Sequence, residues 1–206
     1  MAHPLVILTS WAAVAAGTAS AGVQFRRVTA QGVEAVSLAT WLMFTLIGGF
    51  WIAFGALSAH SWVVISGSVL CWPLQASIVA RLQPWRHWRE LSQATGLFAV
   101  TCILPGVVGG WSWCVYGCGV AMTLMRVPQF MELVRTHDAR GVSAASWFIG
   151  AGCATLWIIY YWNIHLWAPL IATACSGSAS VVIALMALLR HRQNHHDFVR
   201  SEVFAS

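Results

Sequence analysis

Residues 94–125 read ATGLFAVTCILPGVVGGWSWCVYGCGVAMTLM, an apolar run of 32 residues without a charged side chain. As one helix the run would measure about 48 Å at 1.5 Å per residue, whereas the hydrocarbon core of a bilayer is ~30 Å thick. Pro105 and the pair Gly109–Gly110 favour a turn near its middle, and Trp111 suits the headgroup region. The run therefore predicts two short helices, about Leu91–Val108 and Gly110–Arg126.

Five further uncharged stretches are close to the ~20 residues that cross a bilayer as a helix. They are Pro4–Val23, Val36–Leu57, Trp62–Ala80, Ala144–Ile164 and Leu166–Leu189. A content of 59% apolar and 8% charged residues excludes a water-soluble globule. The sequence thus predicts an all-α membrane protein with seven transmembrane helices.

The eleven cationic side chains are all Arg, and each of them follows an odd-numbered predicted span. Because Arg and Lys are enriched in cytoplasmic loops, this distribution predicts a cell-membrane protein with its N-terminus outside and its C-terminus in the cytoplasm. If residues 94–125 formed one helix, the last six Arg would fall on the opposite side. Scattered between apolar stretches, the Arg residues resemble membrane flanks and do not indicate a nucleic-acid partner.

A sequence pattern occurs twice in the chain. At an offset of 106 residues the pairs are Ser37/Ser143, Trp41/Trp147, Trp51/Trp157 and Phe54/Tyr160, while Gln24 and Gln129 are 105 apart. The offset contains four predicted crossings, an even number, so the two copies point the same way. This predicts a first three-helix repeat over residues 1–84, a linker helix over 85–109, a second repeat over 110–190 and a cytoplasmic tail over 191–206.

The motifs of the second copy resemble those of the PQ-loop membrane proteins, which include the SWEET and SemiSWEET (MtN3/saliva) sugar transporters. The matching residues are Pro128-Gln129, Gly141-Val142-Ser143, Ser146-Trp147, and Trp157 with Tyr160. In the first copy Val23, Ala35 and Phe54 replace the Pro, Gly and Tyr of the pattern. The resemblance implies two parallel three-helix bundles that rock around a central substrate site, with Gln24, Pro128 and Gln129 at the hinge.

Trp51 and Trp157 are the aromatic candidates for that substrate site. Each follows Trp41 or Trp147, which we interpret as interfacial anchors, by ten residues. Ten helical residues rise about 15 Å, so Trp51 and Trp157 are expected near the middle of the membrane. The resemblance implies that they stack on a sugar, and the alternative is that they serve only in helix packing.

The polar candidates are hydroxyl side chains on the third helix of each repeat. They are Ser66, Ser68, Thr173 and Ser176, and Trp72 is a further aromatic candidate. In the family an Asn on the third helix typically contacts the sugar, but the equivalent positions here, sixteen residues past Trp51 and Trp157, hold Gly67 and Thr173. Small hydroxyl residues also suit helix packing, so both roles stay open.

No ionisable side chain falls inside the predicted spans, and we interpret Arg126 as a cytoplasmic flank. Because intramembrane ionisable groups mark ion coupling, we expect a facilitative transporter, a uniporter, of a small neutral polar solute, with sugar the class that the resemblance implies. The alternatives are a non-transporting PQ-loop receptor or assembly factor, or a carrier of amino acids or other small metabolites. We expect no enzymatic activity, catalytic residue, metal or cofactor. The lipid bilayer is the expected surrounding, and homo-oligomer formation stays open.

Overall fold

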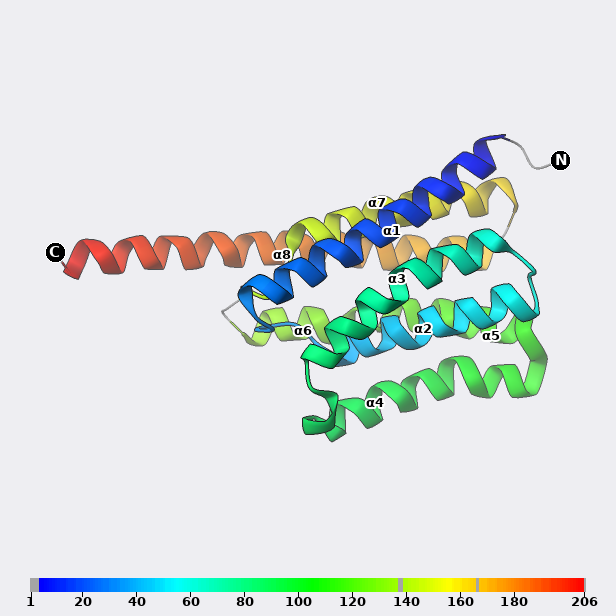
Figure 1. Ribbon diagram of the computed structural model, residues 1–206, viewed down its shortest axis with the longest axis horizontal. Helices are drawn as coiled ribbons and strands as arrows, with labels where there is room; N and C mark the ends of the chain where they lie inside the picture. Colours follow the sequence, from blue (N-terminus) through cyan, green and yellow to red (C-terminus); the bar gives the residue numbers. More distant parts are fainter. Residues whose placement is uncertain (1–3, 137–138, 166, 206) are drawn as a thin grey trace.

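The computed structural model of the chain describes the backbone of residues 4–136, 139–165 and 167–205. The described residues form helices and short connections, without a strand (Figure 1). Leu166, the first residue of the predicted last span, lies outside these ranges. The elements are α1 (Pro4–Gln31), α2 (Leu38–Leu57), α3 (Trp62–Arg81), η1 (Pro84–Arg86), α4 (Trp88–Phe98), η2 (Ala99–Ile103), α5 (Leu104–Leu124), α6 (Val127–Arg135), α7 (Ala144–Asn163) and α8 (Trp167–Ala205).

Within the described residues, six helical stretches are long and apolar enough to cross a membrane. They are Pro4–Gln31, Leu38–Leu57, Trp62–Arg81, Trp88–Arg135, Ala144–Asn163 and Pro169–Gln193. The first helix continues past its predicted end until Gly32, which has a φ of 91°. The last helix continues to Ala205, through most of the predicted tail, because no Gly or Pro follows Gly177 to interrupt it. These lengths show an all-helical protein of the integral membrane type.

The 48-residue stretch Trp88–Arg135 is interrupted at Gly110. Gly110 has φ 72° and ψ −163°, a conformation that residues with a side chain rarely adopt. The chain reverses there, and the two arms pack against each other, with the Cys114 thiol donating to the Cys102 carbonyl oxygen at 3.1 Å (Figure 1). The predicted break in the apolar run is confirmed, although the first arm begins earlier than predicted and contains the π-helical turn η2.

Six helices form a closed ring. α3 packs against both α1 and α2, and α8 packs against both α5 and α7. Contacts of α1 with α7 and of α2 with α5 join these two sets, while α4 lies against α2. The start of α1 and the end of α8 lie at opposite ends of the molecule (Figure 1).

The buried Gln24 side chain of α1 braces the loop before α7. Its amide nitrogen donates to the carbonyl oxygen of Gly141 at 2.7 Å, and its amide oxygen accepts from the backbone N–H of Ser143 at 2.8 Å. Both bonds join residues more than a hundred positions apart in the sequence. The first helix of one copy thus holds the loop of the other.

Gln129, on α6, makes the reciprocal brace to the loop before α2. Its amide nitrogen donates to the Ala35 carbonyl oxygen at 2.6 Å, and its amide oxygen accepts from the Ser37 N–H at 3.0 Å. Ala35 and Ser37 are the counterparts of Gly141 and Ser143 at the 106-residue offset. The two copies of the sequence pattern therefore exchange the same pair of hydrogen bonds.

A second pair of bonds follows the same relation. The Thr40 hydroxyl donates to the Met125 carbonyl oxygen at 2.7 Å, and the Ser146 hydroxyl donates to the Ser20 carbonyl oxygen at 2.7 Å. Thr40 and Ser146 are again 106 residues apart. Bonds of this kind satisfy buried backbone groups, which would be costly to leave without a partner. They therefore fix how the two sets of helices meet.

The two copies differ at the residue before each glutamine. Val23 lies inside the continuous helix α1, whereas Pro128 lies in the first turn of α6, after the break between α5 and α6. A proline is tolerated in the first turn because its missing N–H has no helical partner there. Gln24 therefore lies on an unbroken helix, whereas Gln129 follows a break between two helices. The hinge role of Gln24, Pro128 and Gln129 stays a prediction.

Exchanging Gly and Ala should have opposite effects on the stability of the fold at positions 141 and 35. A Cβ at Gly141 would lie 2.7 Å from the carbonyl oxygen of Glu34 and 2.8 Å from that of Gly32, so Gly141→Ala should destabilise the fold by roughly 1–3 kcal/mol. Ala35 has a φ of 60°, which is strained for a residue with a Cβ, so Ala35→Gly should stabilise by up to about 1 kcal/mol. Unfolding temperatures in detergent measure both, and shifts in the same direction would contradict the paired geometry.

Candidate functional site

A cavity of about 230 Å³ lies inside the ring of helices. Residues of α1, α2, α3, α5, α7 and α8 line it, together with Met125 and Arg126 between α5 and α6. None of the lining residues comes from α4. Both sequence copies therefore contribute walls to one cavity, and the arm that begins with α4 lies outside it.

Five of the seven residues predicted for a substrate site line this cavity. They are Trp51, Ser68, Trp157, Thr173 and Ser176. Gly67, one of the two positions equivalent to the missing Asn pair, lines it as well, and a Cβ there would lie 4.0 Å from the Trp157 ring. The residues that the repeat spacing selects on α3 and α8 thus line one cavity, and their role in binding a solute stays a prediction.

Ser66 and Trp72 are not among the lining residues. The Ser66 hydroxyl donates to the Trp62 carbonyl oxygen of its own helix at 2.6 Å. Trp72 is 41% exposed, and its indole N–H donates to the Thr45 carbonyl oxygen of α2 at 3.0 Å. Ser66 is adjacent in sequence to the lining residue Gly67, and Trp72 is adjacent to the lining residue Cys71. On a helix, a step of one position turns the side chain to another face.

Aromatic side chains surround each of the two predicted Trp residues. Trp157 lies 5.8 Å from Tyr161 in a stacked arrangement and 5.4 Å from Tyr160 edge-on, between ring centres. Trp51 meets Phe50 edge-on at 5.3 Å and Phe54 edge-on at 5.6 Å. Such neighbours hold an indole ring in one orientation, as a stacking surface for a solute requires.

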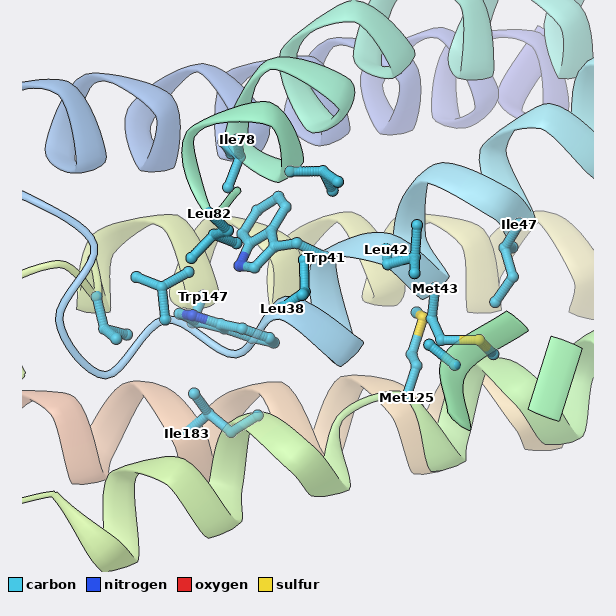
Figure 2. Close-up of a cluster of buried hydrophobic side chains, with 14 of the residues drawn as sticks. Leu38, Trp41, Leu42, Met43, Ile47, Ile78, Leu82, Met125, Trp147 and Ile183 are labelled. Carbon is cyan, nitrogen blue, oxygen red and sulfur yellow. The ribbon is translucent and has the colours of Figure 1, made fainter. Parts of the chain in front are cut away.

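The sequence predicted Trp41 and Trp147 as anchors at the membrane interface, but both side chains are buried inside the protein. They are only 4% and 5% exposed and belong to the same buried hydrophobic cluster as Met125 and Ile183 (Figure 2). Both lie against Phe44, with ring centres 5.3 and 6.2 Å away. The reason is that they occupy the faces of α2 and α7 that point into the ring, where both line the cavity.

Three buried polar atoms of cavity-lining residues have no hydrogen-bond partner in the described part of the chain. They are the indole nitrogens of Trp41 and Trp147 and the amide oxygen of Gln75. Buried polar groups are nearly always satisfied in folded proteins. Their concentration around one cavity distinguishes it from the rest of the interior.

Arg126 is buried in the cavity wall and is not the cytoplasmic flank that its sequence position predicted. The residue is only 8% exposed and lines the cavity. Its Nε donates to the Ser180 hydroxyl oxygen of α8 at 2.9 Å, and its Nη1 donates to the Met122 carbonyl oxygen. The guanidinium carbon lies 5.3 Å from the centre of the Phe44 ring. A cation therefore forms part of a wall that was expected to be uncharged.

No protein-family model, curated protein or solved structure matches the chain. The geometry of this cavity and the residues that surround it therefore provide the evidence for function.

Proposed function

We propose that the chain is a seven-pass membrane transporter that moves a small polar solute down its gradient by alternating access. In this proposal α1–α3 form one three-helix bundle, and α5, α7 and α8 form a second, parallel one that the short helix α6 extends. α4 and η2 begin the linker arm, and the solute binds between the bundles. The cavity carries the proposal, because six helices from both copies enclose it and aromatic and hydroxyl side chains line it. Its volume of about 230 Å³ lies below the range typical of drug-sized ligands, which favours a small metabolite.

Two features of the fold support seven crossings. The reversal at Gly110 divides the longest apolar stretch into two arms, and the start of α1 and the end of α8 lie at opposite ends of the molecule, as an odd number of passes requires (Figure 1). The positions of the eleven Arg residues then favour an N-terminus outside and a C-terminus in the cytoplasm, with the cell membrane the proposed location.

Cysteine labelling in intact cells tests this topology. In a background without the native Cys residues, His87→Cys and Gln193→Cys should react with a membrane-impermeant reagent only after the cells are opened. Ser58→Cys and Ile164→Cys should react from outside, because they follow even-numbered crossings. Labelling of Gln193→Cys in intact cells would contradict the seven crossings.

The reciprocal glutamine braces suggest where the bundles pivot. Gln24 ties α1 to the loop before α7, and Gln129 ties α6 to the loop before α2. The Gly141 N–H joins the two loops by donating to the Glu34 carbonyl oxygen at 3.2 Å. Separating those loops would leave buried backbone groups without partners, which is costly, whereas tilting the bundles about the braces keeps the bonds. We therefore place the pivot at these braces, in agreement with the hinge that the resemblance to PQ-loop proteins implies.

Sugars are the first solute class to test, because the indole faces of Trp51 and Trp157 suit the C–H surface of a sugar and Ser68, Thr173 and Ser176 can bond its hydroxyls. The alternative of a receptor that binds a peptide terminus is less well supported, since the cavity is small. Uptake of a labelled panel of sugars and small polar metabolites into liposomes with the purified protein is the direct test. Uptake of at least one compound above protein-free liposomes is expected, and none for the whole panel would contradict transport.

A further inference from the structure

We propose that the solute is a small hydroxylated carboxylate whose anionic group binds Arg126. This inference rests on the proposed transport function and narrows its substrate class. It replaces the expectation of a neutral solute, whose basis was the absence of charged side chains from the pathway. Arg126 supports it in three ways, because the residue is buried, lines the cavity and is incompletely paired in the described residues.

Burial of Arg126 has a cost that the described structure does not offset with an opposite charge. Among the described residues the single ion pair is that of His87 with Glu90, and no carboxylate lies within 4.0 Å of the Arg126 guanidinium. A buried charge normally requires a counter-charge and hydrogen bonds to its remaining donors. An anion in the cavity would provide both.

The donors of Arg126 show how such an anion would bind. A guanidinium carries five N–H groups in a planar fork that matches a carboxylate. Nε and Nη1 bond to the Ser180 hydroxyl and the Met122 carbonyl, whereas Nη2 has no hydrogen-bond partner in the part of the chain that the structure describes. These two bonds and the Phe44 ring hold the guanidinium in place beside the cavity, so the fork is oriented before the solute arrives.

Neighbouring groups add donors at the same end of the cavity. Trp41 and Trp147 both lie against Phe44, the ring that the Arg126 guanidinium covers, and their indole N–H groups have no partner in the described residues. An indole N–H donates a hydrogen bond to an anion but offers no acceptor atom to a cation. These groups therefore favour a carboxylate over a cation. The opposite end, toward Trp51 and Trp157, presents aromatic and hydroxyl groups to an uncharged body.

The sequence repeat indicates that Arg126 is not required by the architecture. At the 105-residue offset that relates Gln24 to Gln129, the counterpart of Arg126 is Ala21. Ala21 also lines the cavity, and the first copy forms its glutamine brace without a cation at that position. The fold thus accommodates a small apolar residue there, which favours a role of Arg126 in binding over a role in packing.

The test compares acids with neutral compounds of closely similar shape in proteoliposomes. The pairs are glucuronate with glucose, gluconate with sorbitol, and lactate with propane-1,2-diol. The wild type should take up at least one acid, and faster than its neutral partner. Arg126→Gln should slow that uptake by on the order of 10- to 100-fold, because it removes a charge-assisted bond, and Arg126→Lys should retain an intermediate rate. Arg135→Gln, which removes an exposed cation of α6, should leave it unchanged.

Membrane potential gives a second readout that needs no variant. Uniport of a monoanion moves one charge, so an inside-positive potential of about 60 mV should draw the acid to about tenfold accumulation, while a neutral solute only equalises. If neutral compounds are taken up while none of the three acids binds or is taken up, the carboxylate inference is overturned and the proposed transport function stands. If no compound is transported, yet an acid raises the unfolding temperature of the wild type and not of Arg126→Gln, transport fails and the anion site stands.

Discussion

Replacing Gln129 with Met is expected to destabilise the protein by roughly 2–6 kcal/mol, the largest effect on stability that we predict. Met has nearly the same length and fills the same space, but it can neither donate to the Ala35 carbonyl nor accept from the Ser37 N–H. Each buried backbone group left without a partner costs about 1–3 kcal/mol. Gln24→Met should have a similar effect, because Gln24 makes the equivalent bonds to Gly141 and Ser143.

The matched control for these two variants is Gln93→Met on α4, where the glutamine is exposed. Thermal unfolding in detergent should show a decrease of roughly 4–8 °C or more for Gln129→Met and little change for Gln93→Met. If all three variants unfold at the same temperature, the reciprocal braces do not hold the two bundles together.

Replacing Trp157 or Trp51 with Ala is expected to abolish transport while the protein stays folded. Each indole lines the cavity and is held by neighbouring rings, Tyr161 and Tyr160 for Trp157 and Phe50 and Phe54 for Trp51. Removing the ring removes the stacking surface for the solute. Phe in place of either Trp should retain partial activity, since stacking on an aromatic ring is worth about 0.5–1.5 kcal/mol beyond the area that it buries.

Trp162→Ala serves as the matched control for the loss of an indole. Trp162 lies on the same helix as Trp157, is exposed and is not among the cavity-lining residues. Initial uptake rates should fall to background for Trp157→Ala and stay near the wild-type rate for Trp162→Ala. Loss of folded protein in both the Trp51→Ala and the Trp157→Ala variant would support a packing role for this pair instead.

Much of the fold follows from local sequence properties. The apolar stretches predicted the long helices, and the Pro and Gly residues of the 94–125 run predicted the break that the structure places at Gly110. The 106-residue offset selected Trp51, Trp157 and Thr173, which line one cavity. Whether these three side chains bind a solute stays a prediction.

The positions of the buried Trp residues were harder to predict. A Trp near the end of an apolar stretch is usually an interfacial anchor, and Trp41 and Trp147 fit that rule in sequence. Which face of a helix meets lipid depends on tertiary packing, and helices of a membrane protein are apolar on both faces. The same ambiguity assigned Ser66 and Trp72 to the site, although their side chains lie on other faces.

Arg126 shows a different limit of sequence reasoning. A long cationic side chain at the end of a span can extend toward water or turn inward, and its sequence position is the same in both cases. One signal was available, because its counterpart at the 105-residue offset is Ala21 and the repeat does not require a cation. For Arg126, the break in the repeat beside Pro128-Gln129 is therefore a better signal of a candidate site than the distance of the residue from the nearest span.

Solute counterflow tests the central claim, that this cavity carries a solute across the membrane by alternating access. Proteoliposomes are loaded with an unlabelled compound from the transported class and diluted into a trace of the labelled compound, with the membrane potential held at zero. A carrier returns loaded, so labelled solute should rise transiently above its external concentration and then decline, and Trp157→Ala should show no rise. A monotonic approach to equal concentrations in the wild type, or no uptake at all, would contradict the account.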